Sequence, residues 1–323
     1  MAGTPHGQEF GSNRPVVMAR KGMVTSGHPL ASQAGISMLQ KGGNAIDAAL
    51  AVATAISVVE PLMSGIGGDG FIMVYTKADD KLTVANATGA APYAATLDRF
   101  QASGIPFKGI LSASVPSLLK GWTEAHARYG TLSLSEVMAP GMELAANGFP
   151  VSHLLARNIL ADPLICEFPT SADVYARAGR PIRAGEILYQ ENLAKTYEKI
   201  LREGDGVFYG GEIGHAIVKF SEEQGGRLSM KDLADHRVRW QEPISTTYRG
   251  HRIYEAPPNS SGHVLLQALN LAEQFNLGSL GANSLEAIHM MVEAKRMAFA
   301  DREAYMADPE WVDVPIPGLL SKE

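Results

Sequence analysis

The sequence predicts a mixed α and β protein of the α+β class, in which helices outnumber strands. Residues 71–76 and 81–88 have the composition of two strands joined by the polar turn 77–80, and residues 244–248 and 251–256 form a second such pair. Helical spacing of apolar residues accounts for most of the rest. With 323 residues, 46% of them hydrophobic and 19% charged, the chain can form one large core or two domains.

The N-terminal region is expected to begin as a tail and to become ordered at residue 22. Residues 1–21 start with a polar stretch rich in Gly and Pro, and we expect them to be disordered or a remnant of cloning. A short strand over 22–26 and a helix over 28–41 follow. Residues 22–323 are therefore taken together as the folded part of the chain.

The next helix, over residues 45–59, is rich in small residues on every side. Asn44 and Asp47 have the spacing of a capping box at its start. Such a helix can pack close to its neighbours, so we expect it inside a layered core. It is also the longest apolar stretch, but Asp47 interrupts it and it is shorter than the ~20 residues of a membrane span, so we expect a soluble protein without a membrane partner.

The remainder of the chain is mainly helical. Asn283 and Glu286 have capping-box spacing at the start of the last long helix, and residues 312–323 are expected to be extended. The spacing predicts helices over 115–129, 134–147, 153–160, 191–202, 214–224, 229–234, 264–274 and 284–305.

A glycine-rich loop over residues 64–70 contains Gly65-x-Gly67-x-x-Gly70, the spacing of a dinucleotide-binding turn. That chemistry requires a strand before the loop and a helix after it, so that the helix N-terminus meets the phosphates. Here the predicted order is helix, loop, strand. We therefore interpret the loop as a tight connection, and a nucleotide-dependent enzyme remains the weakest of three hypotheses.

Other reactive groups have structural explanations. Glu286, His289 and Glu293 share one face of a predicted helix, but a di-metal site needs a second matching motif, and the sequence has none, so no metal or other cofactor is expected. Cys166 is the only cysteine, which excludes an intrachain disulfide, and its apolar neighbours indicate a buried, inert thiol. The net charge is −6 without a basic stripe, so no nucleic-acid partner is expected.

Two threonines, Thr246 and Thr247, form the most suggestive nucleophile pair. They lie within the predicted strand 244–248, where threonine is a common structural residue. No Gly-x-Ser-x-Gly turn, the usual setting of a serine nucleophile in an α/β-hydrolase, occurs in the sequence.

An ordered set of short motifs resembles the γ-glutamyltranspeptidase family over roughly residues 22–323. The motifs begin with His28-Pro-Leu-Ala-Ser, Gly42-Gly-Asn-Ala-Ile-Asp-Ala-Ala, Glu60-Pro and Ser64-Gly-Ile-Gly-Gly, continue with Ser114-Val-Pro-Ser, Gly121-Trp, Tyr129-Gly, Ala139-Pro and Asn147-Gly-Phe-Pro-Val-Ser, and end with Thr246-Thr-Tyr-Arg-Gly, Pro257-Pro-Asn-Ser-Ser-Gly, Glu293-Ala-Lys-Arg-Met-Ala-Phe-Ala-Asp-Arg, Asp308-Pro and Gly318-Leu-Leu-Ser-Lys.

The resemblance implies an N-terminal-nucleophile hydrolase fold, a four-layer αββα sandwich. Members of the family are made as zymogens that cut themselves into a large and a small subunit, and a threonine at the new N-terminus attacks an amide. Its own α-amino group, with a pKa of about 8, can act as the base. This sequence corresponds to the large subunit, so no catalytic residue is expected in it, and the nucleophile belongs to a small-subunit partner.

The resemblance also points to the substrate-binding residues. The family's large subunit supplies an arginine for the substrate's α-carboxylate, in a Gly-Arg-Glu-Thr-Ala-Pro motif just after the second strand. The matching segment here is Ala87-Thr-Gly-Ala-Ala-Pro92, so Thr88 occupies the arginine position, and no basic residue lies between Lys81 and Arg99. We take Thr88 and the neighbouring Asn86 as candidate substrate-binding residues.

A second departure is Asp69, which stands where the transpeptidases usually have a third consecutive glycine and adds negative charge. Both departures favour the transpeptidase-like paralogues, including cephalosporin acylases, over the glutathione-degrading members. The predicted function is a self-processing amidohydrolase that cleaves a γ-glutamyl or related acyl amide, with hydrolysis favoured over transfer. The alternative is a non-catalytic scaffold of the same fold. The expected location is cytoplasmic, or periplasmic or secreted if a signal peptide was removed.

Overall fold

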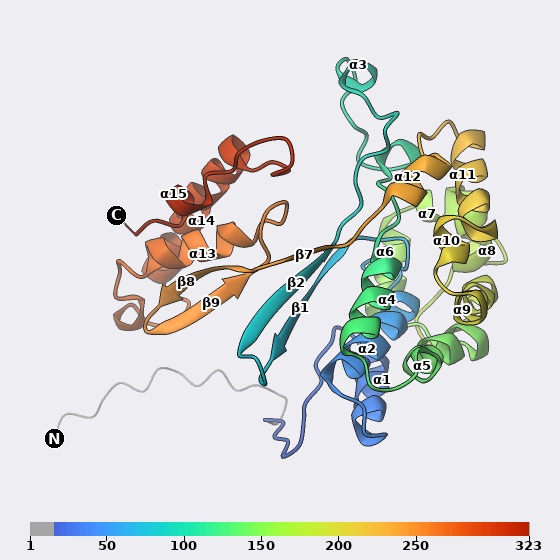
Figure 1. Ribbon diagram of the computed structural model, residues 1–323, viewed down its shortest axis with the longest axis horizontal. Helices are drawn as coiled ribbons and strands as arrows, with labels where there is room; N and C mark the ends of the chain where they lie inside the picture. The colour runs from blue at the N-terminus through green and yellow to red at the C-terminus, as the bar shows by residue number, and fades with distance from the viewer. Residues whose placement is uncertain (1–15, 323) are drawn as a thin grey trace. The chain divides into compact units, whose positions relative to one another are not determined.

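The computed structural model describes residues 16–322. Most of the predicted tail, residues 1–15, lies outside the described residues, and residues 16–21 are exposed and belong to no helix or strand. The chain divides into two compact units. We call residues 19–72 and 87–239 the helical unit, and residues 73–86 and 240–322 the hairpin unit (Figure 1).

The centre of the helical unit is formed by α2 (Ala45–Val59), which packs against α1 (Pro29–Gln40) and α5 (Leu134–Asn147). The small residues of α2 allow this close packing, as predicted. Gly141 in α5 lies so near α2 that a Cβ there would be 2.8 Å from the carbonyl carbon of Thr54. The main chains of the two helices are therefore in direct contact, which fixes their separation.

The capping box predicted for α2 is confirmed. The Asn44 side chain accepts hydrogen bonds from the N–H groups of Ile46 (2.8 Å) and Asp47 (3.1 Å), and Asp47 accepts one from the N–H of Asn44 at 2.8 Å. Asp47 is fully buried and also accepts from the hydroxyl of Thr131 at 2.5 Å and from its N–H at 3.0 Å. One carboxylate thus caps the helix and anchors the loop before α5.

The rest of the helical unit surrounds this centre and has a core around Phe149, Leu155, Ile159, Leu188 and Tyr197. Its strands are two short antiparallel pairs, β3 (Phe149–Pro150) with β6 (Ile187–Leu188) and β4 (Ala176–Arg177) with β5 (Arg180–Pro181). Its other helical elements are α3 (Leu97–Phe100), the 3₁₀ turn η1 (Ile110–Ser112), α4 (Leu118–Tyr129), α6 (His153–Ala161), α7 (Leu164–Glu167), α8 (Pro169–Tyr175), α9 (Glu191–Glu203), α10 (Gly206–Tyr209), α11 (Glu212–Glu223) and α12 (Met230–Asp235).

Both predicted strand pairs are present. A three-stranded sheet has the order β1 (Gly70–Thr76), β2 (Lys81–Ala87), β7 (Arg239–Gln241), and the chain passes between the two units within these strands.

In the hairpin unit, β8 (Ile244–Tyr248) pairs with β9 (His251–Glu255) in antiparallel register, with Thr246 opposite Ile253. Helix α13 (Gly262–Ala272) contacts both of these strands and α14 (Leu285–Tyr305). The unit also contains η2 (Leu277–Ser279) and α15 (Ile316–Leu319).

Four local predictions were wrong. Residues 22–26 form no strand, because an extended run becomes a strand only when it pairs with another one and these residues pair with no described strand. Helix α4 begins at Leu118 rather than at residue 115, because Pro116 disfavours helical conformation at the residue before it. Ser284 rather than Asn283 caps α14, accepting from the N–H of Ala287 at 3.1 Å. Residues 312–323 include the short helix α15, with a proline in its first turn.

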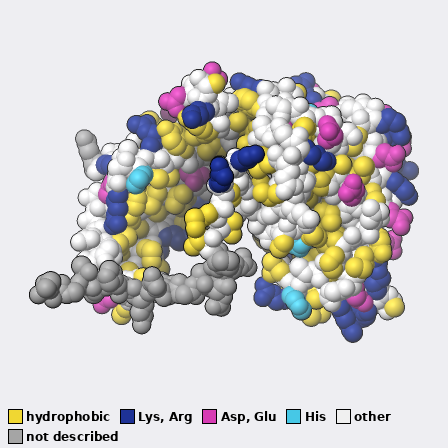
Figure 2. Space-filling view, turned by 90° about the horizontal axis from the view of Figure 1, so that it is seen from below, with side chains coloured by type: hydrophobic (Ala, Val, Ile, Leu, Met, Phe, Trp, Pro, Cys, Tyr) yellow, Lys and Arg dark blue, Asp and Glu magenta, His cyan; other side chains and the backbone are white. Residues whose placement is uncertain are grey.

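Helix α14 has exposed apolar residues among its charged ones. One side packs on α13, but several large apolar residues remain exposed, with Val292 at 47% and Ile288 at 44% of full exposure. Figure 2 shows hydrophobic side chains reaching the surface on one face of the molecule. Between residues 16 and 322, no helix is both long enough and apolar enough to cross a bilayer.

Candidate functional site

The two candidate substrate-binding residues lie at the end of β2. Asn86 is 1% exposed, and its Nδ2 donates to Gln241 Oε1 at 3.1 Å and to Asn259 Oδ1 at 2.9 Å. Both hydrogens of its amide group are thus used inside the hairpin unit. Thr88, the first residue after the strand, is half-buried. Of the two, Thr88 has the exposure that a contact with substrate requires.

The segment that carries Thr88 is fixed by Asp69 of the glycine loop. Asp69 Oδ1 accepts a hydrogen bond from the N–H of Gly89 at 2.6 Å and lies 2.8 Å from the hydroxyl of Ser117, while Oδ2 accepts from the Ser114 hydroxyl at 3.2 Å. We call Asp69, Gly89, Ser114 and Ser117 the Asp69 cluster. It joins the glycine loop, the exit of β2 and the start of α4, all within the helical unit.

The main chain of the glycine loop also binds the start of α4. The carbonyl of Gly68 accepts from the N–H groups of Leu118 at 2.9 Å and Ser117 at 3.3 Å, and the carbonyl of Ile66 accepts from Leu119 at 3.3 Å. These are N–H groups that a helix leaves unsatisfied, and that a phosphate would otherwise bind. Since the loop also follows a helix and precedes a strand, its geometry does not suit a dinucleotide.

Ser117 lies at the centre of this arrangement. Its side chain is fully buried, and its hydroxyl lies 3.0 Å from the carbonyl of Gly68 and 2.8 Å from that of Ala87, besides Asp69. One hydroxyl hydrogen is shared among three acceptors from two segments. Ser117 therefore holds the loop against β2, and its burial excludes it as a nucleophile.

Gly89 allows the exit of β2 to lie against the segment before α4. A Cβ at this position would be 1.8 Å from the carbonyl oxygen of Val115, so no other residue fits. The N–H of Val115 donates to the carbonyl of Ala90 at 3.0 Å. From the sequence, Asp69 was expected only to add negative charge, and its cluster was not predicted. The one available signal was Ser114 and Ser117, with hydroxyls three residues apart just before a helix.

The cationic and titratable groups around the cluster have other partners. Lys120 forms an ion pair with Asp205 at 2.8 Å, and the ring of His236 stacks on Tyr209, with centroids 5.7 Å apart. Burial lowers the pKa of His236, although a hydrogen bond with the Ser117 main chain and the charge of Asp69 both act to raise it. His236 is consequently neutral at pH 7, and no Lys or Arg among residues 16–322 forms an ion pair with Asp69.

The remaining candidates have structural roles. Thr246 is buried and donates its hydroxyl hydrogen to Asn270 Oδ1 at 2.6 Å, as expected of a structural threonine. Glu293 pairs with Arg296 at 2.8 Å, and no group of metal-ligating side chains occurs in the described part of the chain. Cys166 is half-buried against the core rather than fully buried, because the short helix α7 lies near the surface.

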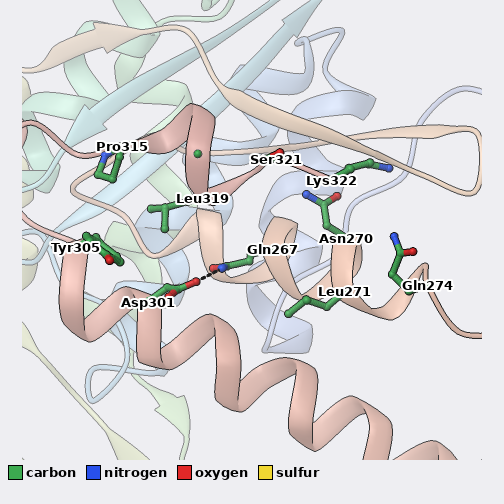
Figure 3. A pocket seen from close by; sticks show the side chains of 11 residues that line it. Gln267, Asn270, Leu271, Gln274, Asp301, Tyr305, Pro315, Leu319, Ser321 and Lys322 are labelled. Atoms are coloured by element: carbon green, nitrogen blue, oxygen red, sulfur yellow. Dashed lines mark hydrogen bonds between the residues drawn. The ribbon is translucent and has the colours of Figure 1, made fainter.

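A cavity of about 770 Å³ lies within the hairpin unit, between α13, α14 and the C-terminal segment (Figure 3). Gln267 donates its amide to Asp301 across this cavity, and Asn270 Nδ2 donates to the carbonyl of Leu320 at 3.0 Å. The carbonyl oxygen of the Gln267 side chain is buried without a partner among the described residues. These contacts join α13 to α14 and to the C-terminal segment.

Comparisons with known proteins agree with the motifs. The profile of the family described as Gamma-glutamyltranspeptidase matches residues 31–323. The chain is 38% identical over 322 residues to a glutathione hydrolase proenzyme of Bacillus subtilis, covering 97% of this chain and 55% of the relative. The chain thus spans little more than half the length of that relative.

Two solved structures have the same fold. The γ-glutamyltranspeptidase of Helicobacter pylori superposes with a TM-score of 0.90 at 34% identity, covering 95% of this chain and 90% of that one. A cephalosporin acylase of Bacillus halodurans superposes with a TM-score of 0.89 at 37% identity, covering 100% of this chain and 61% of that one. The expected N-terminal-nucleophile hydrolase fold is confirmed, and the chain belongs to the γ-glutamyltranspeptidase family.

Proposed function

We propose that this chain is the large subunit of a self-processing amidohydrolase. Its substrate is an amide of a γ-glutamyl or related acyl group, and hydrolysis is favoured over transfer. The family match over residues 31–323 supports this assignment. So do the coverages, since the chain accounts for 90% of the H. pylori chain but only 55% of the B. subtilis proenzyme.

In the proposed reaction, the N-terminal threonine of a small-subunit partner attacks the amide carbon. A bond forms between its hydroxyl oxygen and the acyl carbon, its proton passes by way of the α-amino group to the leaving amine, and water then hydrolyses the ester to release the acid. No cofactor takes part in these steps. The exposed apolar residues of α14 support a partner chain, because such residues are common at permanent interfaces. The cytoplasmic location expected from the sequence stays a prediction.

Thr88 is the observation that carries the substrate assignment. It follows β2 at the position where the resemblance places the carboxylate-binding arginine, and the neighbouring Gly89 is fixed by Asp69. A threonine hydroxyl can donate one hydrogen bond but carries no charge. We propose that Thr88 contacts the acyl group and that this enzyme binds a substrate α-carboxylate less tightly than an arginine-containing relative.

The test is Thr88→Arg in the complete, processed enzyme. A charge-assisted arginine–carboxylate pair in a desolvated pocket contributes about 2–5 kcal/mol. We expect kcat/KM for γ-glutamyl amides to rise at least roughly tenfold, mainly through KM, because part of that energy goes into ordering the new side chain. Thr88→Met, of similar length but uncharged, is the control. An unchanged or lower kcat/KM in the arginine variant would show that Thr88 is not in the acyl pocket.

The assignment as an enzyme is tested separately, by the mass and N-terminal sequence of both chains of the processed protein. A second chain beginning with Thr is expected. A chain beginning with any residue other than Thr, Ser or Cys would support the non-catalytic scaffold instead. The ratio of acid to transfer product, measured with an added acceptor amine, then shows whether hydrolysis dominates.

A further inference from the structure

Asp69 places a fixed negative charge next to the residue proposed to contact the acyl group. Its carboxylate is exposed, yet hydrogen bonds to Gly89, Ser114 and Ser117 hold it in place. A free surface aspartate could rotate away from an approaching anion. Asp69 would have to give up these three contacts to do so, so its charge stays beside the main chain of residues 88–89.

This charge is not neutralised by its surroundings. Lys120 is paired with Asp205, and His236 is kept neutral at pH 7 by burial. No Lys or Arg occurs in the sequence between Lys81 and Arg99. Arg239 begins β7, the strand next to β2, but forms no ion pair with Asp69. Asp69 thus contributes a negative charge without an ion-pair partner beside residues 88–89, whereas a binding site for a carboxylate requires positive charge or several N–H donors.

We infer that Asp69 is a specificity-determining residue of the acyl site, which selects against acyl groups that carry a carboxylate and favours those that carry an ammonium group. This inference rests on the proposed function, because it takes the end of β2 as part of the acyl pocket. It adds a substrate class: amides of uncharged or amino-substituted acyl groups. Asp69 acts by charge and does not take part in bond making or breaking.

Four p-nitroanilides separate the two charges of a γ-glutamyl group. The γ-glutamyl compound has both an ammonium and a carboxylate group, the 4-aminobutyryl compound only the ammonium, the glutaryl compound only the carboxylate, and the butyryl compound neither. The wild-type complete enzyme should show its highest kcat/KM with the 4-aminobutyryl compound and its lowest with the glutaryl compound.

Asp69→Asn is the informative variant, because it removes the charge and keeps an oxygen that can accept from Gly89 and Ser117, while its amide nitrogen can donate to the Ser114 hydroxyl that now donates to Oδ2. We expect the kcat/KM ratio of the glutaryl to the butyryl compound to rise about three- to tenfold, the range for one charge acting across several ångströms near a protein surface. The ratio of the 4-aminobutyryl to the butyryl compound should fall by a similar factor. Both changes should shrink in 0.5 M salt, which screens exposed charges. Asp173→Asn, at an exposed aspartate of α8, should change neither ratio.

Hydrogen exchange at the Gly89 amide shows whether the segment is still in place. Protection should be retained in Asp69→Asn and reduced in Asp69→Ala, which has no acceptor. Retained protection with unchanged ratios in Asp69→Asn would overturn the inference, and the proposed function would stand if Thr88→Arg still raised activity on carboxylated donors. If neither variant altered donor preference, the acyl-pocket assignment itself would fail. An enzyme that hydrolysed none of the four compounds would overturn both.

Discussion

Replacing Gly89 by alanine should destabilise the helical unit more than adding a methyl group at any glycine of the loop over residues 64–70. The new Cβ would be 1.8 Å from the carbonyl oxygen of Val115 and 2.8 Å from its carbonyl carbon, and both are main-chain atoms. Ordinary contact distances require the two segments to separate by roughly 1.5 Å. The hydrogen bonds from Val115 to Ala90 (3.0 Å) and from Gly89 to Asp69 (2.6 Å) would then be broken.

Two lost hydrogen bonds at about 1 kcal/mol each, together with about 1–3 kcal/mol for overpacking, give a loss of about 3–5 kcal/mol. The assay is urea unfolding of the complete protein followed by circular dichroism. Gly65→Ala is the matched control, because no atom lies within 4 Å of the place that its methyl group would take and its main chain is not left-handed. We expect that control to be neutral or stabilising by up to about 1 kcal/mol. Equal midpoints for the two variants would refute the close approach of Gly89 to Val115.

Three further changes test other contacts. Asp47→Ala should lower the free energy of unfolding by about 2–4 kcal/mol, because several N–H and hydroxyl donors lose their buried acceptor. Burial raises the pKa of Asp47, but its hydrogen bonds lower the pKa more, so the ionised carboxylate stabilises the wild type above about pH 4 and this stabilisation is lost as the carboxylate protonates in acid. The difference in stability between wild type and variant should therefore shrink as the pH falls below about 4. Hydrogen bonds from Arg180 lower the pKa of Glu186 to about 2, so Glu186→Gln should flatten the fall in melting temperature between pH 5 and pH 2, and an unchanged acid profile would contradict the pairing. Thr246→Val should lower the free energy of unfolding by about 1–2 kcal/mol, because Asn270 loses the hydroxyl that donates to it. The complete enzyme with this variant should still form the acyl-enzyme, as detected by mass. Loss of acylation without loss of stability would identify Thr246 as catalytic instead.

Much of the fold could be predicted because local signals and tertiary contacts agree. The helices over 45–59 and 134–147 have their predicted bounds, since capping boxes mark their starts and a proline or glycine follows their ends. Residues 22–26 failed for the opposite reason. Strand formation depends on a partner, which composition alone does not specify. The start of α4 was misplaced because main-chain bonds to a distant loop, and Pro116, set its first turn.

The candidate site divides in the same way. Residue 88 could be found from the order of motifs, since it follows a well-marked strand. Asn86, two residues earlier, has an amide side chain that could bind a substrate, but it donates both amide hydrogens to Gln241 and Asn259. Those partners lie more than 150 positions away in sequence, and no local sequence pattern predicts these contacts. Likewise, Asp69 belongs to the site through hydrogen bonds with two segments distant from it in sequence, the exit of β2 and the start of α4, which no local pattern predicts.

The apolar surface of α14 has a practical consequence for handling the protein. Ile288, Met291 and Val292 are each close to half exposed and lie within about one turn of the helix, so they form an apolar patch on its surface. Aggregation rather than unfolding should therefore limit the concentration at which this chain can be kept in solution by itself. The yield of soluble protein should improve when the chain is produced together with a chain that covers this patch.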